Sequence, residues 1–210
     1  MVELQTIYLN KVRETIARLG ACNLFLAAHR TSNDVYSLEA AVLQARKALE
    51  AVAFAAIAPN KAEYEQFRAE VEKPAYYRKD YNARAILQRL GNINKDFYPT
   101  PLLAPTRKAD GSWHFERKSD GCLTKEQFES FYDRLGKYLH ADNPWGNDKG
   151  TQNLVRDLPR VIEQLQALLE WHFTVIRTPQ FNGVWVIEVG LGGTAPRVLV
   201  GKADGEFVVQ

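Results

Sequence analysis

Residues 35–58, VYSLEAAVLQARKALEAVAFAAIA, repeat apolar side chains at steps of three and four positions, the spacing that lines one face of an α-helix. The preceding segment TSND, residues 31–34, offers short polar side chains that suit an N-cap, and Pro59 stops the helix. This is the strongest helical pattern in the chain. It predicts a mainly helical fold.

The segment before this helix has a pattern of the same kind. Apolar residues recur at helical spacing over residues 4–19, and Gly20 is of the type found just past a helix end. On the other side, Asn60 with Glu63 resembles a capping box, in which two side chains satisfy free amides of the first turn. We therefore expect one helix over residues 4–19 and a short one that runs toward residue 71.

Three more helices are expected further along the chain. Asp80 is expected to cap a helix that ends at Gly91. Thr124 and Gln127 form a second capping-box signature, and the amphipathic segment FESFYDRLGKYLH follows them. A last helical pattern covers about residues 151–171.

Residues 92–123 do not follow a helical period. They contain several prolines, an Asp110-Gly111 pair typical of a tight turn, and the alternating run SWHFERK. These features predict a long irregular insertion with one hairpin. An insertion of this kind in a compact domain is either functional or disordered.

Past Trp171 the apolar period changes to two. The runs FTVIRT, VWVIEV, RVLVG and EFVVQ are separated by the turn signals NG, GLGGTA and KADG. The predicted fold is therefore mainly α within the α+β class. It has a helical domain in residues 1–171, with the insertion at about 92–123, and a C-terminal antiparallel β-meander in residues 172–210. Because short sheets need a covered face, the meander is expected to pack on the helices.

Composition limits the function of the chain. Its 210 residues are 46% hydrophobic and 25% charged, enough for one sizeable core. Lys and Arg number 27 against 25 Asp and Glu, so any contact with nucleic acid must be local and no membrane surface is expected. Cys22 and Cys122 have no metal-ligand spacing and indicate reduced thiols in a cytoplasmic protein. The amphipathic N-terminus carries Glu3 and Glu14, unlike a signal peptide, and no run is long and apolar enough to span a membrane.

The segment YDRLGKYLHADNPWG, residues 132–146, contains a pair of residues suited to RNA chemistry. Arg134 and His140 lie six positions apart near the end of a predicted helix, just before a polar loop. Cleavage of RNA without a metal needs a base for the proton of the 2′-hydroxyl and a fixed cation for the charge on the phosphoryl oxygens. Histidine titrates near neutrality and suits the first task, whereas arginine binds phosphate oxygens in a planar fork and suits the second.

This R-x5-H spacing at a helix end, together with the long helix at 35–58 and the helix after the loop, resembles the HEPN superfamily. The resemblance covers about residues 34–171. It implies a metal-independent endoribonuclease with no cofactor, a 2′,3′-cyclic phosphate product, and catalysis by Arg134 and His140. It also implies a place in toxin–antitoxin, CRISPR or anti-phage systems, with an antitoxin or another protein as partner. Active members commonly have a polar residue after the arginine, whereas this chain has Leu135.

Helix geometry, like the family, points to a homodimer. Six positions of an ideal helix advance about 9 Å and turn about 120°, so one Arg134–His140 pair does not converge on a single phosphate. Two pairs related by a two-fold axis can share a cleft. If His140 lies where the helix frays into the loop, its ring can turn inward and a two-fold related partner can complete the site.

Three other residues are candidates for substrate binding: Lys137, Asn143 and Arg46. For Lys137 and Asn143 the alternative is a surface or turn position. The family packs the helix that carries Arg46 against the catalytic helix; for Arg46 the alternative is an exposed pair with Glu50. No metal site is expected, because the remaining histidines lack metal-ligand spacing and are interpreted as structural: His29, His114 and His172.

Two classes of function remain open. One is the dimeric endoribonuclease, and the other is a non-catalytic helical module that binds RNA, a nucleotide or a protein partner, or serves only for dimerisation. A histidine at a helix end also interacts with free carbonyls, and Arg134 beside Asp133 is also compatible with a solvated charge. Leu135 and the balanced net charge favour the non-catalytic module. The coincidence of Arg134, His140, helix end and polar loop favours the enzyme, which is our working hypothesis.

Overall fold

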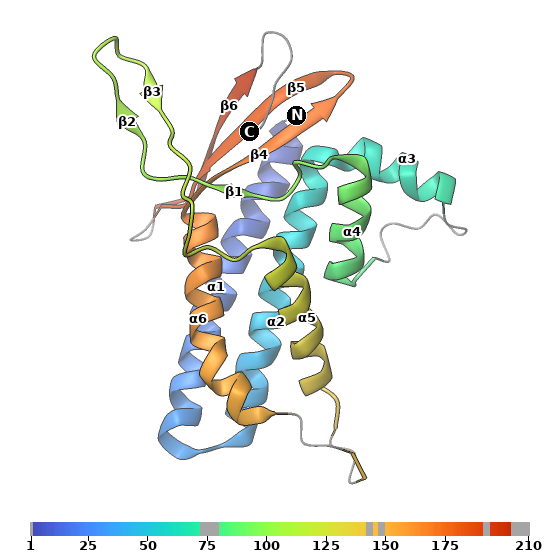
Figure 1. Ribbon diagram of the computed structural model, residues 1–210, viewed down its shortest axis with the longest axis vertical. Coiled ribbons are helices and arrows are strands. Elements are labelled where there is room, and N and C mark those ends of the chain that lie inside the picture. Colours follow the sequence, from blue (N-terminus) through green and yellow to red (C-terminus); the bar gives the residue numbers. More distant parts are fainter. Residues whose placement is uncertain (1, 72–79, 142–144, 147–149, 191–193, 203–210) are drawn as a thin grey trace.

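Two long antiparallel helices, α1 (Val2–Ser32) and α2 (Val35–Ile57), run through the molecule (Figure 1). The structure is a computed structural model that describes residues 2–71, 80–141, 145–146, 150–190 and 194–202. Helices α5 (Lys125–Tyr138) and α6 (Thr151–Glu170) lie along the lower part of the view, whereas η1 (Ala58–Asn60), α3 (Lys61–Val71) and α4 (Ala83–Ile93) lie in its upper part. A small antiparallel sheet lies at the end where α1 begins. The fold is mainly α with a C-terminal meander, as the sequence predicts.

Helix α2 lies at the centre of the helical layer because it is rich in buried alanine. It packs against α1, α4 and α5. Small side chains let neighbouring helices approach closely, near the lower end of the usual range of about 8–10 Å between axes. Leucines and aromatic residues of α4, α5 and α6 fill the remaining space of the main core. The alanines of α2 that are buried are Ala41, Ala45, Ala48, Ala51, Ala53, Ala55 and Ala56.

Local hydrogen bonds fix the turn between α1 and α2. Asn33 adopts a left-handed conformation with φ 53°. The carboxylate of Asp34 then caps α2, accepting from the amides of Ser37 at 2.9 Å and Tyr36 at 3.2 Å. His29 Nδ1 donates to the carbonyl oxygen of Asp34 at 2.8 Å. The predicted N-cap in TSND is therefore confirmed, and His29 has a structural partner.

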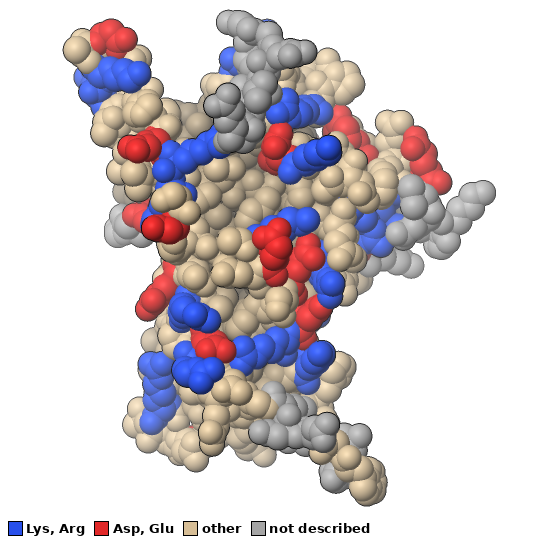
Figure 2. Space-filling view, in the orientation of Figure 1, with Lys and Arg blue, Asp and Glu red and all other residues tan. Residues whose placement is uncertain are grey.

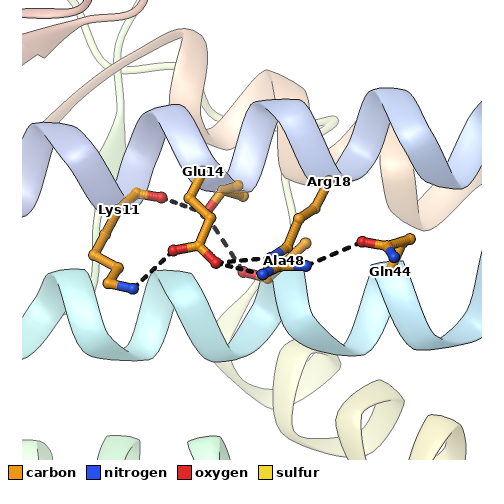
Figure 3. Close-up of polar contacts among 6 residues, drawn as sticks. Lys11, Glu14, Arg18, Gln44 and Ala48 are labelled. Carbon is orange, nitrogen blue, oxygen red and sulfur yellow. Dashed lines mark hydrogen bonds and ion pairs between the residues drawn. The ribbon is translucent and has the colours of Figure 1, made fainter.

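A polar seam joins α1 to α2 further along the pair (Figure 3). Glu14 accepts hydrogen bonds from Lys11 at 2.7 Å and from Arg18 at 2.6 Å, and Arg18 donates to Gln44 of α2 at 3.1 Å. The hydrogen bond from Lys11, followed by that from Arg18, lowers the pKa of Glu14 although partial burial opposes the shift. Glu14 therefore stays ionised at neutral pH, and the hydrogen bond from Arg18 to Gln44 links the two helices.

The predicted end of the first helix at Gly20 is wrong, because α1 continues to Ser32. Beyond the glycine, Cys22 and Leu26 keep the helical spacing and are 0% and 2% exposed. A glycine inside a helix costs about 1 kcal/mol relative to alanine. Burial of a cysteine and a leucine side chain contributes more than that, so packing against α2 extends the helix through the glycine.

Asn60 does not cap α3, although the predicted short helix is present. It lies in the preceding 3-10 turn η1, where its side chain is buried. Its amide donates to the carbonyl oxygen of Ala56 at 3.1 Å and accepts from the amide of Asn94 at 3.0 Å. Asn94 also donates to the carbonyl oxygen of Val175 at 2.8 Å, so this pair of amides ties the helices to the sheet.

Asp80 does not cap α4 either. The cap is Asn82, whose side chain accepts from an amide of the first turn, and the helix ends at Ile93 rather than at Gly91. Asp80 instead accepts from the hydroxyl of Tyr64 at 2.8 Å and pairs with Arg68 at 3.0 Å. These partners lie on α3, and a capping pattern, which spans only a few residues, does not predict contacts with another helix.

The C-terminal strands β4 (Trp171–Thr178), β5 (Phe181–Glu188) and β6 (Arg197–Lys202) form the predicted antiparallel meander. The run EFVVQ, residues 206–210, and most of the GLGG segment lie outside the described residues. The sheet also takes an edge strand from the insertion, β1 (Thr100–Pro101), in the order β1-β4-β5-β6.

The two faces of the sheet are covered by different parts of the chain. One face buries Ile176, Trp185 and Ile187 against Tyr8 and Val12 of α1. On the other face Phe173, Val175 and Val186 pack with Leu102 of the insertion. The insertion also forms the predicted hairpin, from β2 (Thr106–Arg107) and β3 (Trp113–His114). It is thus part of the fold of the sheet.

Candidate active site

The helix that carries Arg134 begins at the predicted capping box. The hydroxyl of Thr124 accepts from the amide of Gln127 at 3.3 Å, and the side chain of Gln127 accepts from the amide of Thr124 at 3.1 Å. The helix leaves Arg134 and Lys137 on its outer flank. Its buried apolar face consists of Phe128, Phe131, Tyr132, Leu135 and Tyr138. Leu135 is therefore a core residue, which explains its apolar side chain beside the arginine.

Arg134 is held by an acidic residue of the neighbouring helix. Its Nη1 donates to Asp157 of α6 at 2.8 Å, and its side chain is 35% exposed. Within the described part of the chain this is the only hydrogen bond of the guanidinium, which leaves Nε and Nη2 for a ligand. The hydrogen bond from Arg134, followed by that from Arg156, holds the pKa of Asp157 below its usual value.

Two hollows meet at Arg134. The larger, of about 560 Å³, lies between α4 and α5, and its cations, Arg84, Arg134 and Lys137, face three carboxylates. The smaller, of about 330 Å³, lies between α5 and α6 and combines Arg134 and Arg160 with one carboxylate, Glu126, and with apolar walls. Figure 2 shows Lys and Arg side chains in a band over the lower part of α5 and α6, with acidic side chains between them. The smaller hollow carries the excess of positive charge.

The structure places His140 two residues past the end of α5, in an exposed bend. His140 is not among the residues that line either hollow, so a single chain does not bring it to Arg134 there. Lys137 is exposed and lines the larger hollow with Arg134. Asn143 lies outside the described residues.

Arg46 lies on α2, away from both hollows. Its guanidinium stacks over the ring of Tyr132, with 4.0 Å from Cζ to the ring centroid, and donates to the hydroxyl of Tyr132 at 2.7 Å. The expected pair with Glu50 is present at 3.3 Å. A Cβ atom on Gly136 would lie 2.5 Å from Arg46 Nη1, so the arginine fills the space that this glycine leaves. These contacts give Arg46 a packing role between α2 and α5.

Sequence reasoning missed Asp157, Arg84 and Arg160. No motif marks them, because Asp157 lies 23 positions from its partner Arg134 and Arg84 belongs to α4. The periodicity of α6 offers one usable signal. Positions 157 and 160 flank the buried Leu158 and Val161, so they border the face that packs against α5.

Among the described residues, no group of three or more His, Cys, Asp or Glu side chains could hold a metal ion. Likewise, no described helix is long and apolar enough to cross a membrane. Comparisons with models of known protein families, with curated proteins and with solved structures found no match.

Proposed function

We propose that the protein is a metal-independent endoribonuclease of HEPN type that binds RNA over α5 and α6. The observation that carries the proposal is the state of Arg134. One nitrogen of its guanidinium is fixed by Asp157, the others are left for a phosphate, and the residue borders a hollow with Arg160. A cation held in advance at the phosphate is what such a transition state needs.

In the proposed reaction the 2′-oxygen attacks phosphorus and the bond from phosphorus to the 5′-oxygen breaks. His140 takes the proton of the 2′-hydroxyl, and Arg134 binds the phosphoryl oxygens as their charge grows. The leaving 5′-oxygen takes a proton from solvent water, and the product carries a 2′,3′-cyclic phosphate. Because His140 lies outside the hollows of its own chain, the site takes the histidine of a two-fold related copy. Cytoplasmic RNA as substrate, and control by an antitoxin or another defence partner, belong to the same proposal.

The test is cleavage of mixed RNA by the purified protein in the presence of a chelator. We expect cleavage by the wild type and a loss of about 10² to 10⁴ in rate for Arg134→Ala and for His140→Ala. Arg177→Ala is a matched control, since Arg177 is 36% exposed and also pairs with an aspartate at 2.8 Å. His29→Ala is the corresponding control for His140→Ala. Wild-type cleavage that persists in both site variants would contradict the assignment.

Two observations favour a second function, a non-catalytic RNA-binding module. The carboxylate of Asp157 offsets part of the charge of Arg134, and the buried Leu135 takes the place of the polar residue common in active members. In that case the protein binds RNA without cutting it, and Arg134→Ala weakens binding while His140→Ala does not.

A further inference from the structure

The β2–β3 hairpin stands clear of the helices and the sheet (Figure 1). Its ladder begins at the bridge between Leu102 and Arg117 and ends at the hydrogen bond between Lys108 and Ser112. The six residue steps from Leu102 to Lys108 reach at most about 20 Å at the rise of an extended strand. Every residue from 106 to 114 is exposed. The hairpin is therefore an arm, and we call residues 102–117 the ribbon.

Both ends of the ribbon are held firmly. At its base Leu102 is buried and the guanidinium of Arg117 lies 5.6 Å from the ring centroid of Phe173. At its tip Gly111 has φ 85°, and Asp110 accepts from the amide and the hydroxyl of Ser112 at 2.9 and 2.6 Å. Two strands without apolar cover are only marginally stable in water, so these bonds are what keep the arm formed.

The exposed side chains of the ribbon combine an aromatic ring with unpaired cations. Arg107 lies directly opposite Trp113 in the ladder, so the two share one face, and His114 lies on the other. Trp113 is 58% exposed. Within the described chain neither Arg107 nor Lys108 has an ion-pair partner. The ribbon, residues 102–117, holds three Lys and Arg against two Asp and Glu, a formal +1.

We propose that the ribbon binds single-stranded nucleic acid, with Trp113 stacked on a base and Arg107 and Lys108 on the adjacent phosphates. Stacking needs an unpaired base, and the phosphates of the same strand are anionic partners for the two cations. A protein partner is a poorer fit for Lys108, because lysine is depleted at protein interfaces, whereas a phosphate chain binds both cations. The ribbon lies at the opposite end of the molecule from the C-terminal end of α5 (Figure 1). It is a second contact that does not depend on RNA cleavage.

The test measures binding of a fluorescein-labelled 2′-O-methyl oligouridylate of about 12 nucleotides, within the usual site sizes. This probe lacks the free 2′-hydroxyl, so a protein that cuts RNA and one that does not are tested alike. Trp113→Ala is expected to weaken binding about tenfold, and Trp113→Phe to restore most of it because a phenyl ring also stacks. Arg107→Ala is expected to weaken binding and to lower the slope of log affinity against log salt by about 0.7.

Matched controls come from exposed residues of α2. Tyr36→Ala removes an aromatic side chain that is 75% exposed, and Lys47→Ala removes an exposed cation. Both should bind the probe like the wild type. The effect of Trp113→Ala should also persist unchanged in an Arg134→Ala background, since distant sites act additively.

Three results would overturn the proposal. The first is wild-type affinity of Trp113→Ala and Arg107→Ala, with circular dichroism showing both folded. The second is tighter binding of a duplex than of the single strand. The third is a lower mass of Trp113→Ala by light scattering with binding unchanged, which would assign the ribbon to a contact between copies of the chain.

Discussion

His172 is fully buried, and its surroundings hold it neutral. Nδ1 donates to the carbonyl oxygen of Leu169 at 2.9 Å, so Nε2 accepts from the hydroxyl of Tyr8 at 2.9 Å. Burial lowers the pKa of His172 to about 4. Between about pH 6.5 and pH 4 the unfolded chain therefore binds a proton that the native state does not. We expect stability to fall by about 3 kcal/mol as the pH drops through this window, and this contribution to level off below it.

Urea unfolding of wild type and His172→Gln across this pH range checks the prediction. The glutamine variant should lack this part of the pH dependence, and the difference between the two proteins removes what the carboxylates contribute. Tyr8→Phe is the control, because it deletes one hydrogen bond and leaves a neutral buried histidine, so its slope should match the wild type. Equal slopes for wild type and His172→Gln would show that the histidine is not held neutral.

Arg46 and Gly136 form a pair that a double-mutant cycle can test. Arg46→Ala removes the stacking on Tyr132 and its hydrogen bonds, and should cost about 1–3 kcal/mol of stability. Gly136→Ala in the wild type gains helix propensity but displaces the guanidinium, so we expect no net gain. In the Arg46→Ala background the same alanine should stabilise by about 0.5–1 kcal/mol. An equal gain in both backgrounds would contradict the packing role.

At the scale of elements, local signals predicted what local contacts build. The caps at Asp34 and Thr124 form within four residues of chain, and both helices start where the sequence indicates. The end of α1 and the edge strand β1 were missed because distant contacts decide them. Thr100, for example, pairs with Phe173. The sequence predicted the hairpin of the insertion and did not predict that its base covers the sheet.

This role of the insertion has a direct test in two adjacent leucines. Leu102 is 5% exposed and packs on the sheet, whereas Leu103 is 42% exposed. We expect Leu102→Ala to cost about 2–4 kcal/mol and Leu103→Ala under about 0.5 kcal/mol, measured by urea unfolding. Similar small effects at both positions would mean that the insertion is not part of the core.

At the scale of the whole molecule, the sequence indicated residues of the candidate site but not their arrangement. The R-x5-H string selects Arg134 and His140, yet it says nothing of Asp157, which fixes the arginine from another helix. It also does not show that Arg46 is hydrogen-bonded to Tyr132. Contacts between helices decide both, and no periodicity within one helix encodes them.

The composite site of the proposed dimer predicts that two inactive variants regain cleavage when their subunits are exchanged. If each site takes Arg134 from one chain and His140 from the other, then Arg134→Ala and His140→Ala homodimers each lack one member at every site. Mixing equal amounts after subunit exchange gives half heterodimers, each with one complete site of two. We therefore expect about a quarter of wild-type cleavage to return. The assay is RNA cleavage in chelator before and after exchange, with light scattering to establish the dimer. If a dimer exchanges and no activity returns, both residues act within one chain; a monomer at micromolar concentration would exclude the composite site.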